Sequence, residues 1–163
     1  MCIRDSNLYG YGDNYHEQNS HVIPGLIRRF NEAKRLNKKT ISVWGTGKPK
    51  REFMFVDDIA RAAIMVMNID KSSYHNITKI RCSHINAGSG IEVSIKELAE
   101  MIADITGFSG QIIFDDTKPD GTPLKLMDSS KLKNLGWKPQ VSLYEGLQIT
   151  NGDYLKNNKK NEK

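Results

Sequence analysis

Apolar residues recur three and four positions apart in two stretches of the chain. Such spacing places them on one face of a helix, so it predicts two amphipathic helices. The first runs from about residue 22 to 36, with Pro24 in its first turn, where a missing backbone N–H costs nothing. The second begins at Asp57 or Asp58, either of which can cap it. The predicted buried faces are Val22, Ile23, Leu26, Ile27, Phe30 and Ala33 in the first helix, and Ile59, Ala62, Ala63, Val66 and Met67 in the second.

Short apolar runs lie between and after these helices. We predict strands over residues 41–44, 53–56, 83–87 and 112–114, with a Gly- and Pro-containing turn at 45–49. Short strands that alternate with amphipathic helices are typical of α/β proteins. The pattern therefore predicts the α/β fold class, and we find no internal repeat.

Three further helices have recognisable ends. Ser94 and Glu97 have the S-x-x-E spacing of a capping box, and Gly107 stands where a left-handed residue ends a helix. A short helix is expected over residues 129–135. The last helix is expected to begin at Ser142 and to fade near Leu155.

The composition narrows the class of protein. A chain of 163 residues is most simply one domain, and 38% hydrophobic with 26% charged residues excludes a disordered chain and a coiled coil. No apolar run approaches the roughly 20 residues that cross a bilayer, and no signal-peptide pattern opens the chain, so we expect a cytoplasmic protein. Cys2 and Cys82 lack metal-ligand spacing, so we expect free thiols and no bound metal.

The positive charge is concentrated at the C-terminal end. Of the formal net charge of +5, the last eight residues carry +3, from four lysines and one glutamate, which leaves +2 for the rest. A nearly neutral body with a basic tail is weak support for a polyanion partner, so we expect no nucleic acid partner.

Two glycine-containing turns suggest a phosphate-binding loop but do not match one. The string Gly45-Thr46-Gly47-Lys48 lacks both the first glycine of a P-loop and the Ser or Thr after its lysine. Gly88 and Gly90 lack the third glycine of the dinucleotide fingerprint, because Val93 stands in its place. Neither turn is predicted to hold a phosphate in these ways.

Several longer strings stand in the loops. Asn7-Leu8-Tyr9-Gly10, Trp44-Gly45-Thr46-Gly47 and Val56-Asp57-Asp58 are accompanied by two more specific strings, Ser20-His21-Val22-Ile23-Pro24 and Lys118-Pro119-Asp120-Gly121-Thr122-Pro123. With them, the chain from Asn7 to about Leu147 resembles the extended short-chain dehydrogenase/epimerase family, and within it the members that form GDP-L-fucose. The resemblance implies the C-terminal part of an NAD(P)-binding Rossmann fold with a small α/β substrate-binding domain.

The resemblance also divides the chain into segments. Residues 1–6 fit nothing downstream, and we expect them to be a non-native leader. Residues 7–155 are expected to form the C-terminal part of the epimerase/dehydratase domain with its substrate-binding subdomain, and residues 156–163 a basic disordered tail. The family's N-terminal half, with its glycine-rich NADP turn and Tyr-x-x-x-Lys pair, does not stand in this sequence, so we expect this fragment alone to be inactive.

The implied activity has two stages on GDP-4-keto-6-deoxy-D-mannose, epimerisation at C3 and C5 and then reduction of the C4 ketone by NADPH. Protons beside a ketone are acidic, so the first stage needs a positioned acid/base group. By the resemblance His21 is that catalytic residue, and Asn7, Leu8 and His21 contact the NADP cofactor. The alternative for His21 is a polar helix-start residue that its neighbours satisfy.

The resemblance implies five substrate-binding residues. Arg29 and Arg51 suit a diphosphate, because a planar guanidinium matches flat, doubly charged groups. Trp44 offers a flat face to the substrate, Asp120 can accept hydrogen bonds from sugar hydroxyls, and Lys125 adds a phosphate contact. The alternatives are ordinary surface arginines, a core tryptophan and a plain Asp-Gly turn.

Two other functions stay open. Another nucleotide-sugar epimerase or reductase of the same superfamily would lack the Ser20-His21 pair and the 118–123 loop. A non-catalytic nucleotide-sugar binding module is favoured by the missing half and by the basic tail. The partners that the resemblance implies are a GDP-sugar and a second copy in a homodimer, with no membrane partner.

Overall fold

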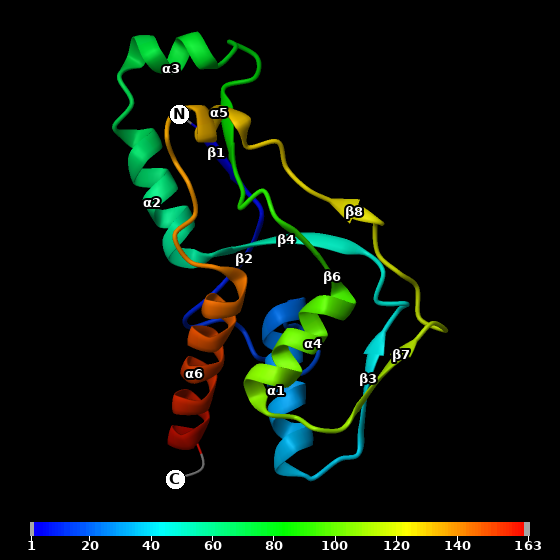
Figure 1. The fold of residues 1–163 in the computed structure, drawn as a ribbon. Helices are drawn as coiled ribbons and strands as arrows, with labels where there is room; N and C mark the ends of the chain where they lie inside the picture. Colours follow the sequence, from blue (N-terminus) through cyan, green and yellow to red (C-terminus); the bar gives the residue numbers. More distant parts are fainter. Residues whose placement is uncertain (1, 162–163) are drawn as a thin grey trace.

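One strand, β4 (Lys50–Phe55), crosses the middle of the molecule in the computed structural model, which describes residues 2–161 (Figure 1). Its C-terminal half pairs in parallel with β2 (Asn7–Tyr9). Its N-terminal half pairs antiparallel with β6 (Glu92–Ser94) and parallel with β8 (Leu124–Lys125). The run Phe53–Phe55 is buried, so β4 can lie in the interior.

Two further pairs of strands complete the sheets. Strand β1 (Cys2–Asp5) pairs in parallel with β5 (His84–Ala87). Strand β3 (Thr40–Trp44) pairs in parallel with β7 (Gln111–Asp115). Buried and exposed residues alternate along β3, as expected for a strand with one face on the core.

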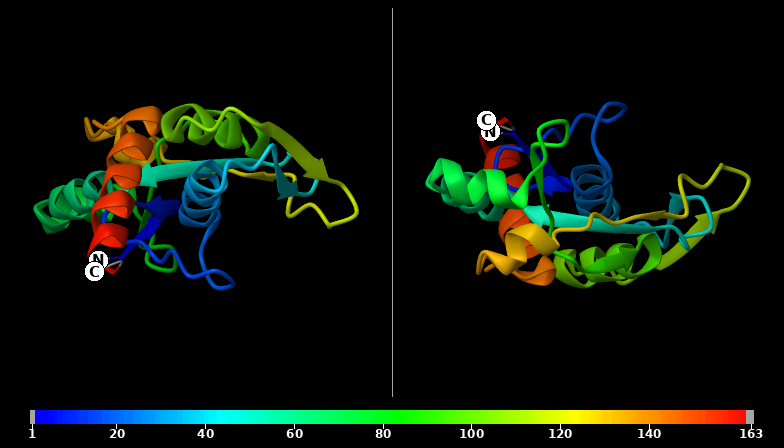
Figure 2. Two further views of the ribbon diagram at one scale, coloured as in Figure 1. Left: turned by 90° about the horizontal axis from the view of Figure 1, so that it is seen from below. Right: turned by 90° about the horizontal axis from the view of Figure 1, so that it is seen from above.

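Three helices lie below the long strand in the view of Figure 1. Helices α1 (Val22–Arg35), α4 (Ile95–Thr106) and α6 (Leu143–Asn161) lie below β4 in Figure 1, and seen along the vertical direction α1 and α4 lie to either side of it (Figure 2). Their buried faces enclose the larger core, in which Phe30 and Phe108 meet edge to face with ring centroids 5.4 Å apart.

The opposite end holds a smaller core. Helices α2 (Val56–Met67), α3 (Lys71–Ile77) and α5 (Ser130–Asn134) lie there with β1 and β5 (Figure 1). The buried residues of this core are Met54, Ala62, Val66, Ile85, Ala87, Leu132 and Trp137. Since Met54 belongs to β4, the long strand contributes to both cores.

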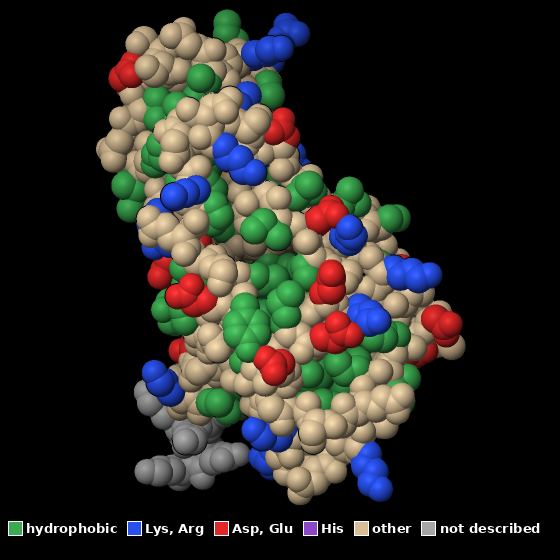
Figure 3. Space-filling model, in the orientation of Figure 1, with side chains coloured by type: hydrophobic (Ala, Val, Ile, Leu, Met, Phe, Trp, Pro, Cys, Tyr) green, Lys and Arg blue, Asp and Glu red, His purple; other side chains and the backbone are tan. Residues whose placement is uncertain are grey.

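Apolar side chains gather below β4, over α4 and α6, on the face that Figure 3 shows, with carboxylates around them. These two helices are also joined by a polar contact, because the Tyr144 hydroxyl donates a hydrogen bond to Asp104 at 2.5 Å. That contact raises the pKa of the Tyr144 hydroxyl. The hydroxyl therefore stays protonated and can keep donating.

The predicted helix signals are confirmed. The Ser94 hydroxyl accepts from the Glu97 N–H at 3.1 Å, and the Glu97 carboxylate accepts from the Ser94 N–H at 2.8 Å, which is the complete capping box. Gly107 ends α4 in the left-handed region with φ of 69°. The α/β alternation, the first helix and the turn at residues 45–49 are likewise confirmed.

We expect Ser94→Ala to lower the free energy of unfolding of this chain by about 1 kcal/mol, the usual cost of losing an N-cap serine. Urea unfolding followed by circular dichroism measures it. Ser109→Ala is the matched control, because Ser109 is an exposed serine outside the cap. Equal stability of the two variants would show that the capping box does not stabilise α4.

The prediction that Asp57 or Asp58 caps the second helix is wrong. Strand β4 leads directly into α2, whose N-cap is Phe55. Both aspartates lie in the first turn, and the buried Asp58 carboxylate accepts from the backbone N–H groups of Gln140 and Val141 at 2.8 and 3.1 Å. The carboxylate thus joins α2 to the segment before α6 rather than capping its own helix.

Both ends of the described chain contain secondary structure that the sequence analysis did not predict. Cys2–Asp5, part of the expected leader, form β1, and the last helix continues past Leu155 to Asn161. Lysine is a good helix former, so the basic end can extend α6. Met1 and residues 162–163, part of the expected leader and tail, lie outside the described residues. Helix α3 was not predicted.

Within residues 2–161 no helix combines the length and the apolar character needed to cross a membrane. The longest helix, α6, carries lysines and asparagines along its C-terminal part.

Candidate functional site

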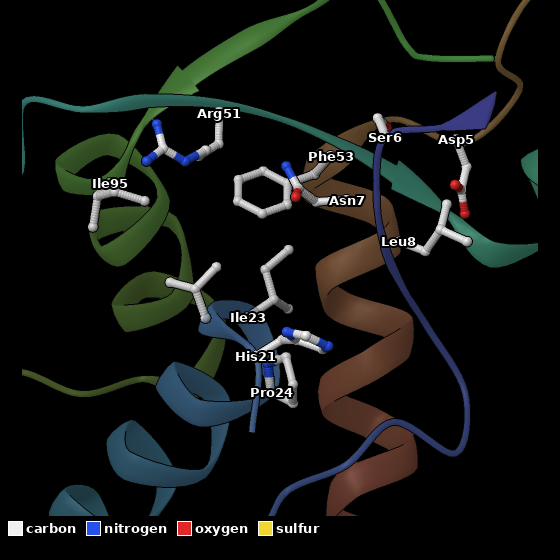
Figure 4. Close-up of a pocket in the computed structure, with 11 residues that line it drawn as sticks. Asp5, Ser6, Asn7, Leu8, His21, Ile23, Pro24, Arg51, Phe53 and Ile95 are labelled. Atoms are coloured by element: carbon white, nitrogen blue, oxygen red, sulfur yellow. The ribbon is translucent and has the colours of Figure 1, made fainter. Parts of the chain in front are cut away.

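A cavity of about 540 Å³ opens where the ends of several elements meet. Its walls are the stretch from the end of β1 into β2, the start of α1, the middle of β4 and the start of α4 (Figure 4). Four residues that the sequence analysis proposed for the site line it together: Asn7, Leu8, His21 and Arg51. The fold therefore brings the proposed catalytic residue, the proposed cofactor residues and one of the five proposed substrate residues to one place.

His21 stands at the entrance of α1 and faces the cavity from below in Figure 4. It is the N-cap residue, with extended backbone angles, and its carbonyl accepts from the Gly25 N–H at 2.9 Å. Within the described residues its side chain makes no capping hydrogen bond. The His21 side chain therefore does not cap α1, and the exposed ring is accessible from the cavity.

Arg51 and Phe53 reach the cavity from the same face of β4, because side chains two residues apart in a strand point the same way. The Arg51 guanidinium donates to the carbonyls of Lys50 and Thr122 at 2.7 and 2.5 Å. A guanidinium has five N–H donors, so these two bonds fix its position and leave others for a ligand.

Asn7 is tied to the neighbouring strand. Its side-chain amide donates to the carbonyl of Glu52 at 2.7 Å, in addition to the parallel pairing of β2 with β4. The cofactor-side residues are thus held against the strand that carries Arg51.

Lys125 lies next to Arg51 without lining the cavity. It belongs to β8 and stands opposite Arg51 in the parallel register, so both side chains leave the same face of the sheet. Two cations are placed side by side at this edge.

Trp44 and Asp120 do not line the cavity; Trp44 precedes the turn before β4, and Asp120 is bonded to Thr46 in that turn. The Asp120 carboxylate accepts from the Thr46 N–H and hydroxyl at 2.8 and 2.6 Å, and these bonds lower the pKa of that carboxyl. The Trp44 ring is 69% exposed and lies 5.9 Å from the Lys118 ammonium. The prediction that Trp44 is more than a core residue agrees with its exposure, and the substrate role of both stays a prediction.

The Arg29 side chain is directed to β3 and not to the cavity. Its guanidinium donates to the carbonyl of Ser42 on β3, and burial, followed by the charge of Arg28, lowers its pKa. It does not line the cavity, so the structure separates it from Arg51.

Several cavity residues were missed by the sequence analysis. Asp5 and Ser6 were assigned to the leader, Ile23, Pro24 and Phe53 were considered only as helix, motif or strand residues, and Ile95 was not considered. The alternation along β4 was the one signal for Phe53, since it shares the face of Arg51.

Asp13 was also missed. It lies in the loop that leads to His21, and burial raises the pKa of its carboxyl, whereas the Asn14 N–H and the charge of His21 lower it. The carboxylate is therefore close enough to His21 for their charges to interact. Its place in the loop before His21 was the only signal in the sequence.

Part of the chain matches a known class of proteins, the NAD dependent epimerase/dehydratase family. Residues 1–80 match the profile of that family. The expected α/β fold of a Rossmann-type dehydrogenase/epimerase is thereby confirmed.

Within this class the chain is similar to proteins named as GDP-L-fucose synthases. It is 52% identical over 152 residues to "Putative GDP-L-fucose synthase 2" of Arabidopsis thaliana, which covers 93% of this chain and 44% of that protein. It is 47% identical over 155 residues to the GDP-L-fucose synthase of Escherichia coli strain K12, which covers 95% of this chain and 48% of that protein. The chain thus spans about half the length of these relatives.

A solved structure is also similar to this chain. The "gdp-l-fucose synthetase" of Naegleria fowleri bound to NADP has a TM-score of 0.83 and 26% sequence identity, covering 96% of this chain and 47% of that one. The arrangement of strands and helices around the cavity is therefore that of a solved member.

Proposed function

We propose that this chain forms the substrate-binding part of a GDP-L-fucose synthase, which epimerises GDP-4-keto-6-deoxy-D-mannose at C3 and C5 and reduces C4. The observation that carries the proposal is the single cavity lined by Asn7, Leu8, His21 and Arg51. The relatives' names support the substrate class.

The cavity residues fit an NADP cofactor. Beside Asn7 and Leu8, the Ser6 hydroxyl is buried and has no hydrogen-bond partner among the described residues, as expected where a ligand with a polar edge binds. Asn7, Leu8 and His21 would hold the nicotinamide end. When bound, NADPH supplies the hydride for the C4 ketone.

His21 would move the proton in the epimerisation. Removing a proton beside the C4 ketone forms an enolate, and the configuration changes when a proton returns to the opposite face. An imidazole titrates close to neutral pH and can deliver the returning proton, while a second group on the other face removes the first one. The exposure of His21 at the cavity wall supports this role.

Arg51 and Lys125 would bind the diphosphate. They lie side by side on β4 and β8, and a charge-assisted, bidentate contact from arginine suits flat phosphate oxygens. Arg29, Trp44 and Asp120 remain proposed substrate contacts that act only if the substrate extends beyond the cavity lining. A homodimer and a cytoplasmic location are further proposals that follow from the family resemblance.

A chimera tests the function. In the Escherichia coli relative, the matched stretch is replaced by this chain, and the protein is given GDP-4-keto-6-deoxy-D-mannose and NADPH. We expect NADPH to be consumed and GDP-L-fucose to form, identified by NMR. The unmodified relative is the positive control.

The alternatives give different results in the same assay. Reduction without inversion at C3 and C5 would indicate another nucleotide-sugar reductase. Binding of GDP without turnover would indicate a non-catalytic module, and either result would contradict the proposal.

A further inference from the structure

Glu52 is a buried carboxylate between two cavity residues. It follows Arg51 and precedes Phe53 on β4, and its side chain is turned to the opposite face, with the residue only 1% exposed. Burying a charge is costly unless hydrogen bonds compensate it. The partners of Glu52 therefore indicate what the charge is retained for.

Those partners are backbone groups of two distant segments. One carboxylate oxygen accepts from the Gly90 N–H at 2.5 Å, and the other accepts from the Met127 N–H at 3.3 Å. The Gly88 backbone packs so closely that an added Cβ would lie 2.4 Å from the carboxylate. The turn after β5 and the segment after β8 thus both rest on this one side chain.

The segment after β8 needs such support because β8 itself is short. It pairs with β4 over two positions, Lys50 with Leu124 and Arg51 with Lys125. The bond from Met127 to Glu52 extends the attachment by two residues beyond Lys125. Lys125 is therefore held on both sides.

We infer that Glu52 is a positioning residue of the nucleotide-sugar site, which holds Lys125 beside Arg51 through the Met127 N–H. This rests on the proposed function, in which these two cations bind the diphosphate. Glu52 itself touches no ligand, because its side chain is turned away from the cavity face.

The chain offers a matched control. Asp58 is also buried and also accepts two backbone N–H groups from a distant segment, those of Gln140 and Val141, but it does not line the cavity. Glu52→Gln and Asp58→Asn each replace a buried carboxylate with an amide whose NH₂ must face a backbone N–H. Asp58→Asn also loses the ion pair with Arg61, so it should destabilise the fold at least as much as Glu52→Gln.

The first measurement is backbone hydrogen exchange of the 163-residue chain. We expect Glu52→Gln to speed exchange of the Gly90 and Met127 amides by roughly tenfold, the usual scale for a lost hydrogen bond to a charged group. Asp58→Asn should leave these two amides as in wild type. Unchanged protection of Met127 in Glu52→Gln would overturn the inference.

The second measurement is GDP titration by calorimetry. We expect Glu52→Gln to weaken GDP binding roughly threefold to tenfold, with Asp58→Asn unchanged. In a Lys125→Ala background, Glu52→Gln should add nothing further, because both variants remove the same contact. Glu52→Asp keeps the charge but is one methylene shorter, so it cannot reach both donors and should show the same loss.

The outcomes separate this inference from the proposed function. Wild-type affinity in Glu52→Gln and Glu52→Asp, or losses that add to that of Lys125→Ala, would overturn the positioning role while GDP binding stands. Absence of GDP binding in wild type would contradict the proposed function, and the exchange of Met127 would still decide whether Glu52 holds the Lys125 segment.

Discussion

Replacing His21 with glutamine in the chimera is expected to slow exchange of the C3 and C5 protons with solvent by roughly 10²-fold or more, the usual contribution of a positioned acid/base group. Glutamine keeps polarity and hydrogen bonding but cannot take up and return a proton near neutral pH. Since His21 uses only its carbonyl in the helix start, the substitution should leave α1 intact. Deuterium incorporation followed by NMR measures the exchange rate.

His75→Gln is the control, because His75 is exposed on α3, away from the cavity. GDP affinity should be nearly unchanged in both variants. Exchange at the wild-type rate in His21→Gln would return His21 to the role of a helix-start residue.

The second expected result is a loss of GDP affinity by roughly 10- to 150-fold in Arg51→Ala, which corresponds to the 1.5–3 kcal/mol of a charge-assisted hydrogen bond. Arg51 lines the cavity, and its guanidinium is fixed by the carbonyls of Lys50 and Thr122. Calorimetric titration of GDP into the 163-residue chain measures it. Affinity for NADPH, measured in the chimera, should change little.

Two comparisons sharpen this prediction. Arg51→Lys should restore affinity only in part, because lysine keeps the charge but loses the planar fork. Arg29→Ala should have a smaller effect than Arg51→Ala, since the Arg29 guanidinium is directed to the Ser42 carbonyl outside the cavity lining. Equal GDP affinity in wild type and Arg51→Ala would remove Arg51 from the site.

Features set by near neighbours were predicted well from the sequence. The spacing of apolar residues located the first helix to within a residue at its end, and the Ser94–Glu97 box and the Gly107 terminator are as expected. Each depends on residues within one or two turns of the chain. The pattern of the sequence contains all of that information.

Features that depend on residues far apart in the sequence were not predicted. Asp58 looked like a helix cap because nothing local showed that the N–H groups of Gln140 and Val141 would reach it. Cys2–Asp5 had no visible place because their partner strand, His84–Ala87, lies far along the chain. In both cases the partner is defined only by the fold.

The candidate site shows the same division. The motif strings indicated which residues belong to the site, but not which of them share a wall. Asn7, Leu8, His21 and Arg51 meet in one cavity, whereas Asp120 is bonded to Thr46 and Arg29 to Ser42. Glu52 was hidden because it lies between two motif residues and faces the other way.

One continuous strand carries both Arg51 and Phe53, and Asn7 is paired to Phe53. The strand therefore fixes the distance between these parts of the cavity wall. Two residues of a strand span roughly 7 Å, so the spacing between Arg51 and the wall formed by Phe53 and Asn7 is set by residue count. A movement of the elements around the larger core relative to those around the smaller core would leave that spacing unchanged as long as β4 stays intact. Under the proposed function, the length of sugar nucleotide that fits the cavity would depend on this strand.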